Sequence, residues 1–200
     1  FNFPPTQLIH IDIDPSEIGR NYPVAIGAIA DLKQALRTLN RIARQRCPQG
    51  IKRPELVAAI AANRAAFIAG NKAGMESNAW PMQPQRILAD LRTALPRDSI
   101  ICTDVGWNKN GVAQQYPVYE PASIFTPGGF ATMGFGAPAA IGAKLACPDR
   151  VVVALVGDGG FGQNPAMLAT AVEQKVPVIW VIMNNHAFGT IAGLELAHFN

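Results

Sequence analysis

The second half of the chain alternates short, continuously apolar runs with stretches of helical character. Residues 99–103, 151–156 and 178–183 are apolar at nearly every position, as strands are when helices cover both faces of their sheet. Residues 138–146 and 165–174 carry the small and apolar side chains of helices. This alternation predicts an α/β domain, in which a parallel sheet is flanked by helices in a Rossmann-like three-layer arrangement.

The first half predicts two strands, at residues 8–14 and 24–29, and then helices. Asp31 suits the N-cap of an amphipathic helix. We interpret the basic face of this helix as solvated and not as a nucleic-acid site, because no aromatic residues alternate with its charges. Pro54 suits the start of an Ala-rich helix ending near Gly70.

Another helix is expected from Pro84, ending at Pro96, and the residues before it are polar and rich in turn formers. Residues 104–110 are the loop expected after the strand at 99–103, and residues 128–136 are a glycine-rich loop expected to lead into the helix at 138–146.

Composition excludes a disordered chain and a membrane span. Hydrophobic residues make up 49% of the 200 positions and charged residues 16%, against about 25% in a typical soluble domain. Apolar runs are broken before the roughly 18–20 residues that a membrane helix needs. Three distant cysteines without zinc spacing, and no signal peptide, favour a cytoplasmic location. The chain begins at Phe1 without a methionine, and we expect it to be part of a longer protein.

Two polar segments follow two of the predicted buried strands. Residues 157–160 (GDGG) follow one strand, and Asn184 and Asn185 follow the next. The 24 residues between Gly159 and Asn184 leave room for one crossover helix and a return strand. Because ligands bind at the carboxyl ends of parallel strands, both segments are expected at one edge of the sheet.

The chemistry of these segments predicts a site for a metal ion and a diphosphate. Asp158 and Asn185 offer the oxygen atoms that Mg²⁺ or Ca²⁺ requires. Gly159 and Gly160 let backbone N–H groups approach phosphate oxygens. The simpler alternative is a tight turn from strand to helix. A generic nucleotide-binding domain is another, although no GxGxxG motif is present.

This pairing resembles the signature of enzymes that use thiamine diphosphate (ThDP, also called thiamine pyrophosphate): GDG, about two dozen residues, then NN. Three more stretches are similar to acetolactate synthase-like enzymes, in the order of that family. They are residues 8–24 (LIHIDIDPSEIGRNYPV), 130–142 (FATMGFGAPAAIG) and 148–161 (PDRVVVALVGDGGF). The resemblance implies that residues 1–50 are the tail of the middle domain, 51–82 a linker helix region and 83–200 the N-terminal part of the ThDP-binding domain.

The resemblance also implies roles for single residues. Asp158, the side chain of Asn185 and the backbone carbonyl of Ala187 would bind Mg²⁺. Met133 would wedge the cofactor into its V shape, and the carbonyl of Ala131 would hold the 4′-amino group. The other cofactor-binding residues implied are Gly106, Trp107, Asn108, Gly157, Gly159, Gly160 and Thr190.

Some of these residues have a simpler interpretation. Met133 could be an ordinary core methionine, and Trp107 a packed aromatic. His186 and His198 are each a lone histidine beside a motif, and we assign them no catalytic role. The resemblance implies that the activating Glu belongs to an N-terminal domain, so we expect no catalytic residue in these 200 positions.

The implied parent is a ThDP- and Mg²⁺-dependent decarboxylase or carboligase, a transferase or lyase. It would act on a small 2-oxo acid such as pyruvate as a homodimer or homotetramer, with FAD as a further cofactor in some members. Acetolactate synthases proper have Gln-His at Trp107-Asn108 and commonly Glu at Met167, so reactions of the glyoxylate carboligase, benzoylformate decarboxylase or sulfoacetaldehyde acetyltransferase type stay open. Alone, the 200 residues are expected to be inactive, as an assembly module without catalysis.

Overall fold

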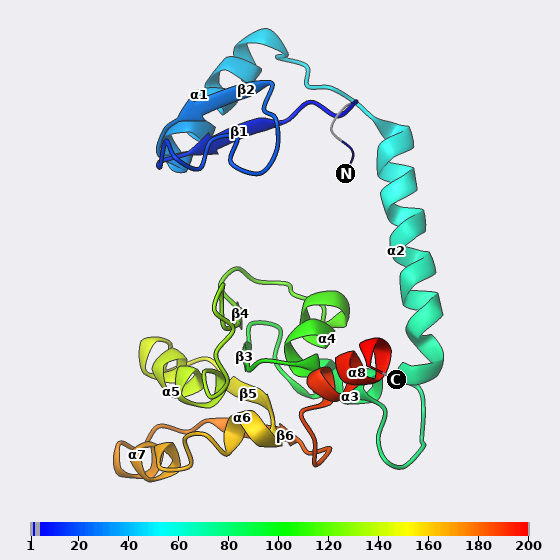
Figure 1. Ribbon diagram of the computed structural model, residues 1–200, viewed down its shortest axis with the longest axis vertical. Helices are drawn as coiled ribbons and strands as arrows, with labels where there is room; N and C mark the ends of the chain where they lie inside the picture. The colour runs from blue at the N-terminus through cyan, green and yellow to red at the C-terminus, as the bar shows by residue number, and fades with distance from the viewer. Residues whose placement is uncertain (1, 3–4, 200) are drawn as a thin grey trace. The chain divides into compact units, whose positions relative to one another are not determined.

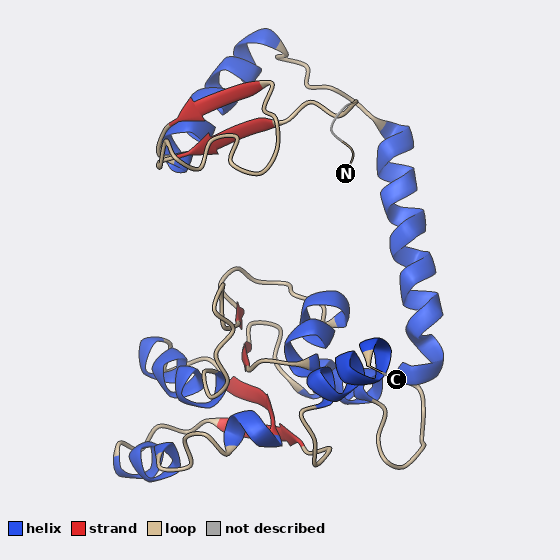
Figure 2. Cartoon of the chain, viewed as in Figure 1, coloured by secondary structure: helices blue, strands red, loops and turns tan. Residues whose placement is uncertain are grey.

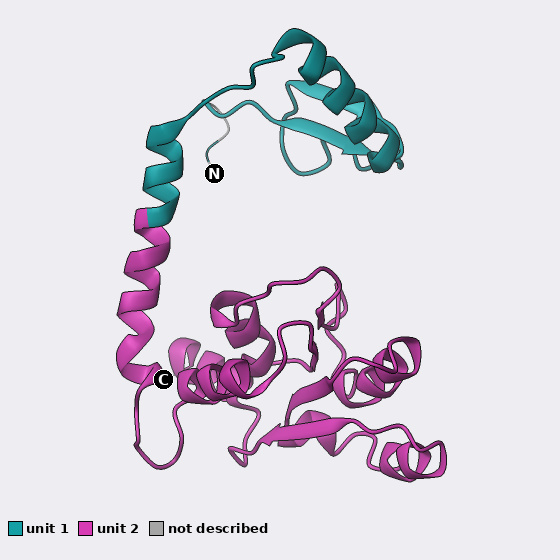
Figure 3. Cartoon of the chain, turned by 180° about the vertical axis from the view of Figure 1, so that it is seen from behind, with its two compact units in different colours: residues 1–61 teal, residues 62–200 magenta. Residues whose placement is uncertain are grey.

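The computed structural model describes residue 2 and residues 5–199, and the chain forms two compact units, residues 1–61 and 62–200 (Figure 3). The first unit contains a two-stranded parallel sheet of β1 (Ile9–Asp12) and β2 (Ile26–Ile29). Both strands lie within the predicted ranges.

A capped helix follows these strands in the first unit. In α1 (Leu32–Arg46), Asp31 Oδ1 accepts a hydrogen bond from the Gln34 N–H at 3.0 Å. This bond satisfies one of the N–H groups that the first turn of a helix leaves without a partner. The predicted N-cap is confirmed.

The helix that starts at Pro54 is longer than predicted. It is α2 (Pro54–Met75), and it continues through Gly70, where the sequence predicted its end. Nothing lies within 4 Å of a Cβ built on Gly70, so glycine at this position costs only its low helix propensity, roughly 1 kcal/mol relative to alanine. That loss is too small to end a helix whose flanking residues are good helix formers.

The second unit is built on a four-stranded parallel sheet. Its order is β4-β3-β5-β6, formed by β3 (Ile100–Thr103), β4 (Ile124–Phe125), β5 (Val152–Gly157) and β6 (Ile179–Met183) (Figure 2). The three predicted strands are confirmed. The edge strand β4 was not predicted, because two residues are too few to show a periodic pattern.

Helices cover both faces of this sheet, as predicted. α5 (Gly136–Ala146) and α7 (Met167–Glu173) pack on one face, and α3 (Pro84–Ala94) and α4 (Trp107–Gln115) on the other (Figure 1). Successive side chains of a strand point to opposite faces. The first face accordingly buries Ile100, Cys102, Val152, Ala154 and Val156, and the second Ile101, Val153 and Leu155.

Three helical segments of this unit were not predicted from the sequence. α4 occupies part of the loop predicted at residues 104–110, and the glycine turn after β5 is a single helical turn, α6 (Asp158–Phe161). α8 (Gly189–His198) was not predicted. In α4, a Cβ built on Gly111 would lie 2.4 Å from the Trp107 ring, so the glycine that obscured this helix in the sequence makes room for the indole.

None of the described helices is long and apolar enough to cross a membrane. All three cysteines are free, with Cys102 buried, Cys147 half-buried and Cys47 exposed.

Gly136→Ala and Gly142→Ala, both in α5, are expected to change stability in opposite directions. A Cβ on Gly136 would lie 2.7 Å from the backbone carbonyl carbon of Thr103, so we expect a loss of ~2 kcal/mol or more. Nothing lies within 4 Å of a Cβ on Gly142, where alanine should add up to about 1 kcal/mol. Urea unfolding of the intact protein measures both, and equal effects would contradict the packing of α5 on the end of β3.

Cys102 is expected to resist alkylation in the folded protein. Burial raises the pKa of its thiol from 9.0 to about 12, so the thiol stays protonated at pH 8.5. It is also inaccessible to the reagent, because Cys102 is fully buried. The pKa of the Cys102 thiol is higher in the folded than in the unfolded protein. The stability that its buried, protonated form contributes is therefore full below the unfolded pKa and is lost as the pH rises toward 12. Iodoacetamide and mass spectrometry should find Cys47 modified first; equal rates would contradict the burial.

Candidate metal and diphosphate site

The carboxyl ends of β5 and β6 meet at one edge of the sheet. Gly157, the last residue of β5, pairs with Met183, the last residue of β6. Asp158 and Asn184 therefore leave the sheet from paired positions. The register brings the GDGG and NN segments together, as the spacing of the two motifs predicted.

The two asparagines fold the segment after β6 into tight turns. Asn184 Oδ1 accepts a hydrogen bond from the His186 N–H at 3.1 Å, and Asn185 Oδ1 accepts one from the Ala187 N–H at 3.3 Å. His186 has a φ of 56°, a left-handed conformation that is uncommon outside glycine. An amide oxygen has two lone pairs, so Asn185 can keep this bond and still bind a cation.

Asp158 supplies the negative charge at this edge. It is half-buried, and its carboxylate accepts no hydrogen bond from any described residue. No group of three or more His, Cys, Asp or Glu side chains suited to a metal gathers in the described part of the chain. A cation here would thus be held by one carboxylate together with amide and carbonyl oxygens, which suits a hard ion.

Two apolar side chains lie over Gly159. A Cβ built on Gly159 would be 2.6 Å from Phe188 Cε1 and 3.1 Å from Met133 Cε. Glycine is therefore needed for both side chains to approach the main chain here. The family resemblance implied a cofactor-binding role for Met133 but not for Phe188. The only feature of the sequence that could have pointed to Phe188 is its position three residues after the asparagine pair.

The N-termini of α4 and α8 approach each other beside this turn. Gly106 precedes α4 with a φ of 104°, and a Cβ on it would lie 3.5 Å from Thr190 Oγ1, in the first turn of α8. The first N–H groups of a helix lack intrahelical partners and carry a partial positive charge. Two such ends beside Asp158 form a region that favours an anion and a cation together.

Asn108 connects the start of α4 to the end of β5. It is buried, its Nδ2 donates to the Val105 carbonyl at 3.1 Å, and the same nitrogen is 3.7 Å from the Cβ position of Gly157. Its Oδ1 has no hydrogen-bond partner among the described residues. A buried polar atom without a partner is costly, so this oxygen is suited to a water or ligand donor.

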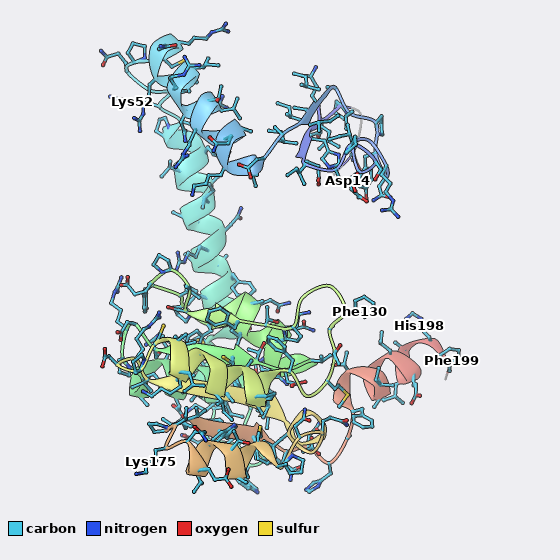
Figure 4. The ribbon with its side chains drawn as sticks, turned by 90° about the vertical axis from the view of Figure 1, so that its left-hand side faces the viewer. Asp14, Lys52, Phe130, Lys175, His198 and Phe199 are labelled. Atoms are coloured by element: carbon cyan, nitrogen blue, oxygen red, sulfur yellow. The ribbon has the colours of Figure 1, made fainter. Side chains whose placement is uncertain are left out.

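The other implied residues do not converge in the same way. The Trp107 ring packs with the apolar cluster beneath α3 and α4, in agreement with its simpler interpretation. Ala131 is half-buried with a φ of 48°, and its N–H donates to the Gly128 carbonyl at 3.1 Å. Phe130 is 99% exposed, and both it and His198 project outward (Figure 4).

Asp104, which the sequence placed only at the start of a loop, is a central residue of this edge. It follows β3 and is fully buried. Its Oδ1 accepts hydrogen bonds from the N–H groups of Val105 at 2.8 Å and Gly134 at 3.1 Å, and its Oδ2 from that of Gly136 at 2.8 Å. No motif identifies such a residue, because two of its three donors, Gly134 and Gly136, lie 30 and 32 positions away.

Two family models match the chain. Residues 104–200 match the C-terminal TPP binding domain of thiamine pyrophosphate enzymes, and residues 1–39 match their central domain. Together the matches cover more than half of the chain.

Several curated proteins are similar over nearly the whole chain. A probable acetolactate synthase large subunit of Methanocaldococcus jannaschii is 37% identical over 201 aligned residues, which cover 94% of this chain and 32% of that protein. One of Methanococcus aeolicus is 34% identical, covering 92% and 32%. The acetolactate synthase large subunit of Lactococcus lactis is 35% identical, covering 91% and 30%. The chain thus spans about a third of the length of these relatives.

Ala131→Gly is expected to raise stability, whereas the same change at Ala169 should lower it. Glycine tolerates the left-handed backbone of residue 131, so we expect a gain of about 1 kcal/mol there. Ala169 is exposed within α7, where glycine costs about 1 kcal/mol of helix propensity. Urea unfolding compares them, and a loss at both positions would contradict the left-handed conformation of Ala131.

Proposed function

This chain belongs to the thiamine pyrophosphate enzymes, and we propose that the edge formed by β5, β6 and the starts of α4 and α8 binds the diphosphate of ThDP through a magnesium ion. The observation that carries the proposal is the approach of Gly106 to Thr190 beside the paired ends of β5 and β6. It joins two helix N-termini, which favour phosphate, to a carboxylate and an amide, which favour Mg²⁺.

In this proposal the metal is held by oxygen atoms from two segments. The free carboxylate of Asp158 supplies the charge, and the side chain of Asn185 and the backbone carbonyl of Ala187 supply neutral oxygens. The left-handed turn at His186 supports this role, because strained backbone often accompanies ligand sites.

The diphosphate would lie against the starts of α4 and α8. Gly106 leaves room for it to approach the backbone, and the N–H groups of Gly159 and of the first helical turns would donate to its oxygens. Thr190 adds a hydroxyl donor. The backbone of Gly157, Gly160 and Trp107 and the side chain of Asn108 would line the same region, with Asn108 Oδ1 able to accept from an ordered water.

The apolar part of the cofactor would meet Met133. Methionine is long and adaptable, which suits a residue that holds a bent ligand in shape. Phe188 adds a second apolar surface over Gly159, and the carbonyl of Ala131 would hold the amino group. When bound, ThDP supplies the electron sink for cleavage and formation of bonds next to a carbonyl.

We propose that the whole protein is a decarboxylase or carboligase of small 2-oxo acids, active as a homodimer or homotetramer. The names of the similar proteins, acetolactate synthases, support the carboligase. Of the acidic residues described at this edge, Asp104 is buried and accepts three backbone N–H donors, and Asp158 is assigned to the metal. The catalytic carboxylate would therefore come from outside these 200 residues, which would be inactive alone.

Asp158→Ala is expected to abolish most ThDP binding in the intact protein. Removing a residue that hydrogen-bonds to a metal ligand weakens metal binding about 10–100-fold. Removing the ligand itself should weaken it more. Isothermal titration with ThDP at saturating Mg²⁺ measures the effect. Asp149→Ala, an exposed carboxylate before β5, is the matched control and should bind as the wild type does. Equal binding by the two variants would refute the assignment.

A further inference from the structure

We propose that Asp104 is a positioning residue that sets the width of the ThDP site, by fixing the Met133 loop to the glycine turn after β5. The inference rests on the proposed function, because it concerns how that site is held in shape. The residue itself would not contact the cofactor or the metal.

The first part of the argument is the set of donors around the carboxylate. The carboxylate accepts hydrogen bonds from the N–H groups of Gly134 and Gly136, which are one and three residues after Met133. A carboxylate is an acceptor only, and charge-assisted bonds of this kind are about twice as strong as neutral ones. Asp104 is fully buried, so water cannot replace these donors. The loop that carries Met133 is therefore attached to the end of β3.

The second part is the contact between Asp104 and Gly160. A Cβ built on Gly160 would lie 2.7 Å from both Cγ and Oδ1 of Asp104. Any side chain at residue 160 would displace the carboxylate. The two adjacent glycines of the turn thus have different reasons to be glycine, since Gly159 leaves room for Met133 and Phe188, whereas Gly160 leaves room for Asp104.

These contacts join the two sides of the site through one buried group. Met133 precedes Gly134, one of the donors to Asp104, and Gly159 precedes Gly160, which packs against the same carboxylate. Met133 Cε lies 3.1 Å from the Cβ position of Gly159. In our proposal, Asp104 sets this spacing. Protein interiors are close-packed and transmit small shifts, and a displacement of about 1 Å in a site can cost on the order of 100-fold in function.

A merely structural role would lower stability without changing the site. Asp104→Asn separates the two roles, because it keeps the volume of the side chain but places an NH₂ group against one of the backbone donors. Val152→Ala is the matched control: it removes buried volume at the amino end of β5, on the opposite edge of the sheet. Both variants are compared in the intact protein at a temperature where both are fully folded.

The first measurement is hydrogen exchange without ThDP, read by mass spectrometry over residues 128–136. We expect this segment to exchange at least about 10-fold faster in Asp104→Asn than in the wild type, with β5 unchanged, and no such local effect in Val152→Ala. Unchanged exchange of the segment would overturn the inference whatever the cofactor does.

The second measurement is the Kd for ThDP at saturating Mg²⁺. We expect an increase of 10-fold or more for Asp104→Asn and less than twofold for Val152→Ala. Gly160→Ala should reproduce the effect, and combining it with Asp104→Asn should weaken binding less than the two separate effects together, because both act on one contact. Gly160→Ala also replaces Asp104→Asn if that variant does not fold.

The outcomes distinguish this inference from the proposed function. Binding of ThDP by the wild type with an unchanged Kd in Asp104→Asn and in Gly160→Ala overturns the positioning role alone. Failure of the wild type to bind ThDP overturns the proposed function and this role with it.

Discussion

The parallel pairing of β3, β5 and β6 is the constraint on which the larger unit depends. β3 and β5 are buried on both faces, whereas β6 is partly exposed; all three run the same way, so their carboxyl ends lie along one edge. Asp104, Asp158 and Asn184 each follow one of these ends directly. The sheet thereby brings together three polar segments that are up to eighty positions apart in the chain.

Close packing at this edge is achieved with glycines and one buried carboxylate. An isolated carboxylate in a protein interior costs several kcal/mol, and the three N–H donors around Asp104 offset that cost only if the surrounding loops stay in place. Gly134, Gly136 and Gly160 permit that approach, because a Cβ on any of them would overlap a neighbour. Binding geometry and stability are therefore coupled at the same few residues.

Elements with an unambiguous pattern were predicted well, and those without one were not. The strands β3, β5 and β6 are continuous apolar runs, and α1 and α3 start at Asp31 and Pro84 as predicted. By contrast, α4 has a central glycine and many polar residues, and the packing of the Trp107 ring against Gly111 is visible only in the folded chain. β4 is recognised as a strand by its pairing with Ile101 and Cys102 of β3.

Local pattern was enough to identify the α/β class, the strands β3, β5 and β6 of the larger unit, and the pairing of the GDGG and NN segments. These follow from periodicity and from spacing, which are properties of neighbouring residues. The contacts of Asp104 with Gly134, Gly136 and Gly160, and of Phe188 and Met133 with Gly159, could be found only in the folded molecule. Each joins residues brought together by strand register and helix packing, and such distances leave no periodic trace in the sequence.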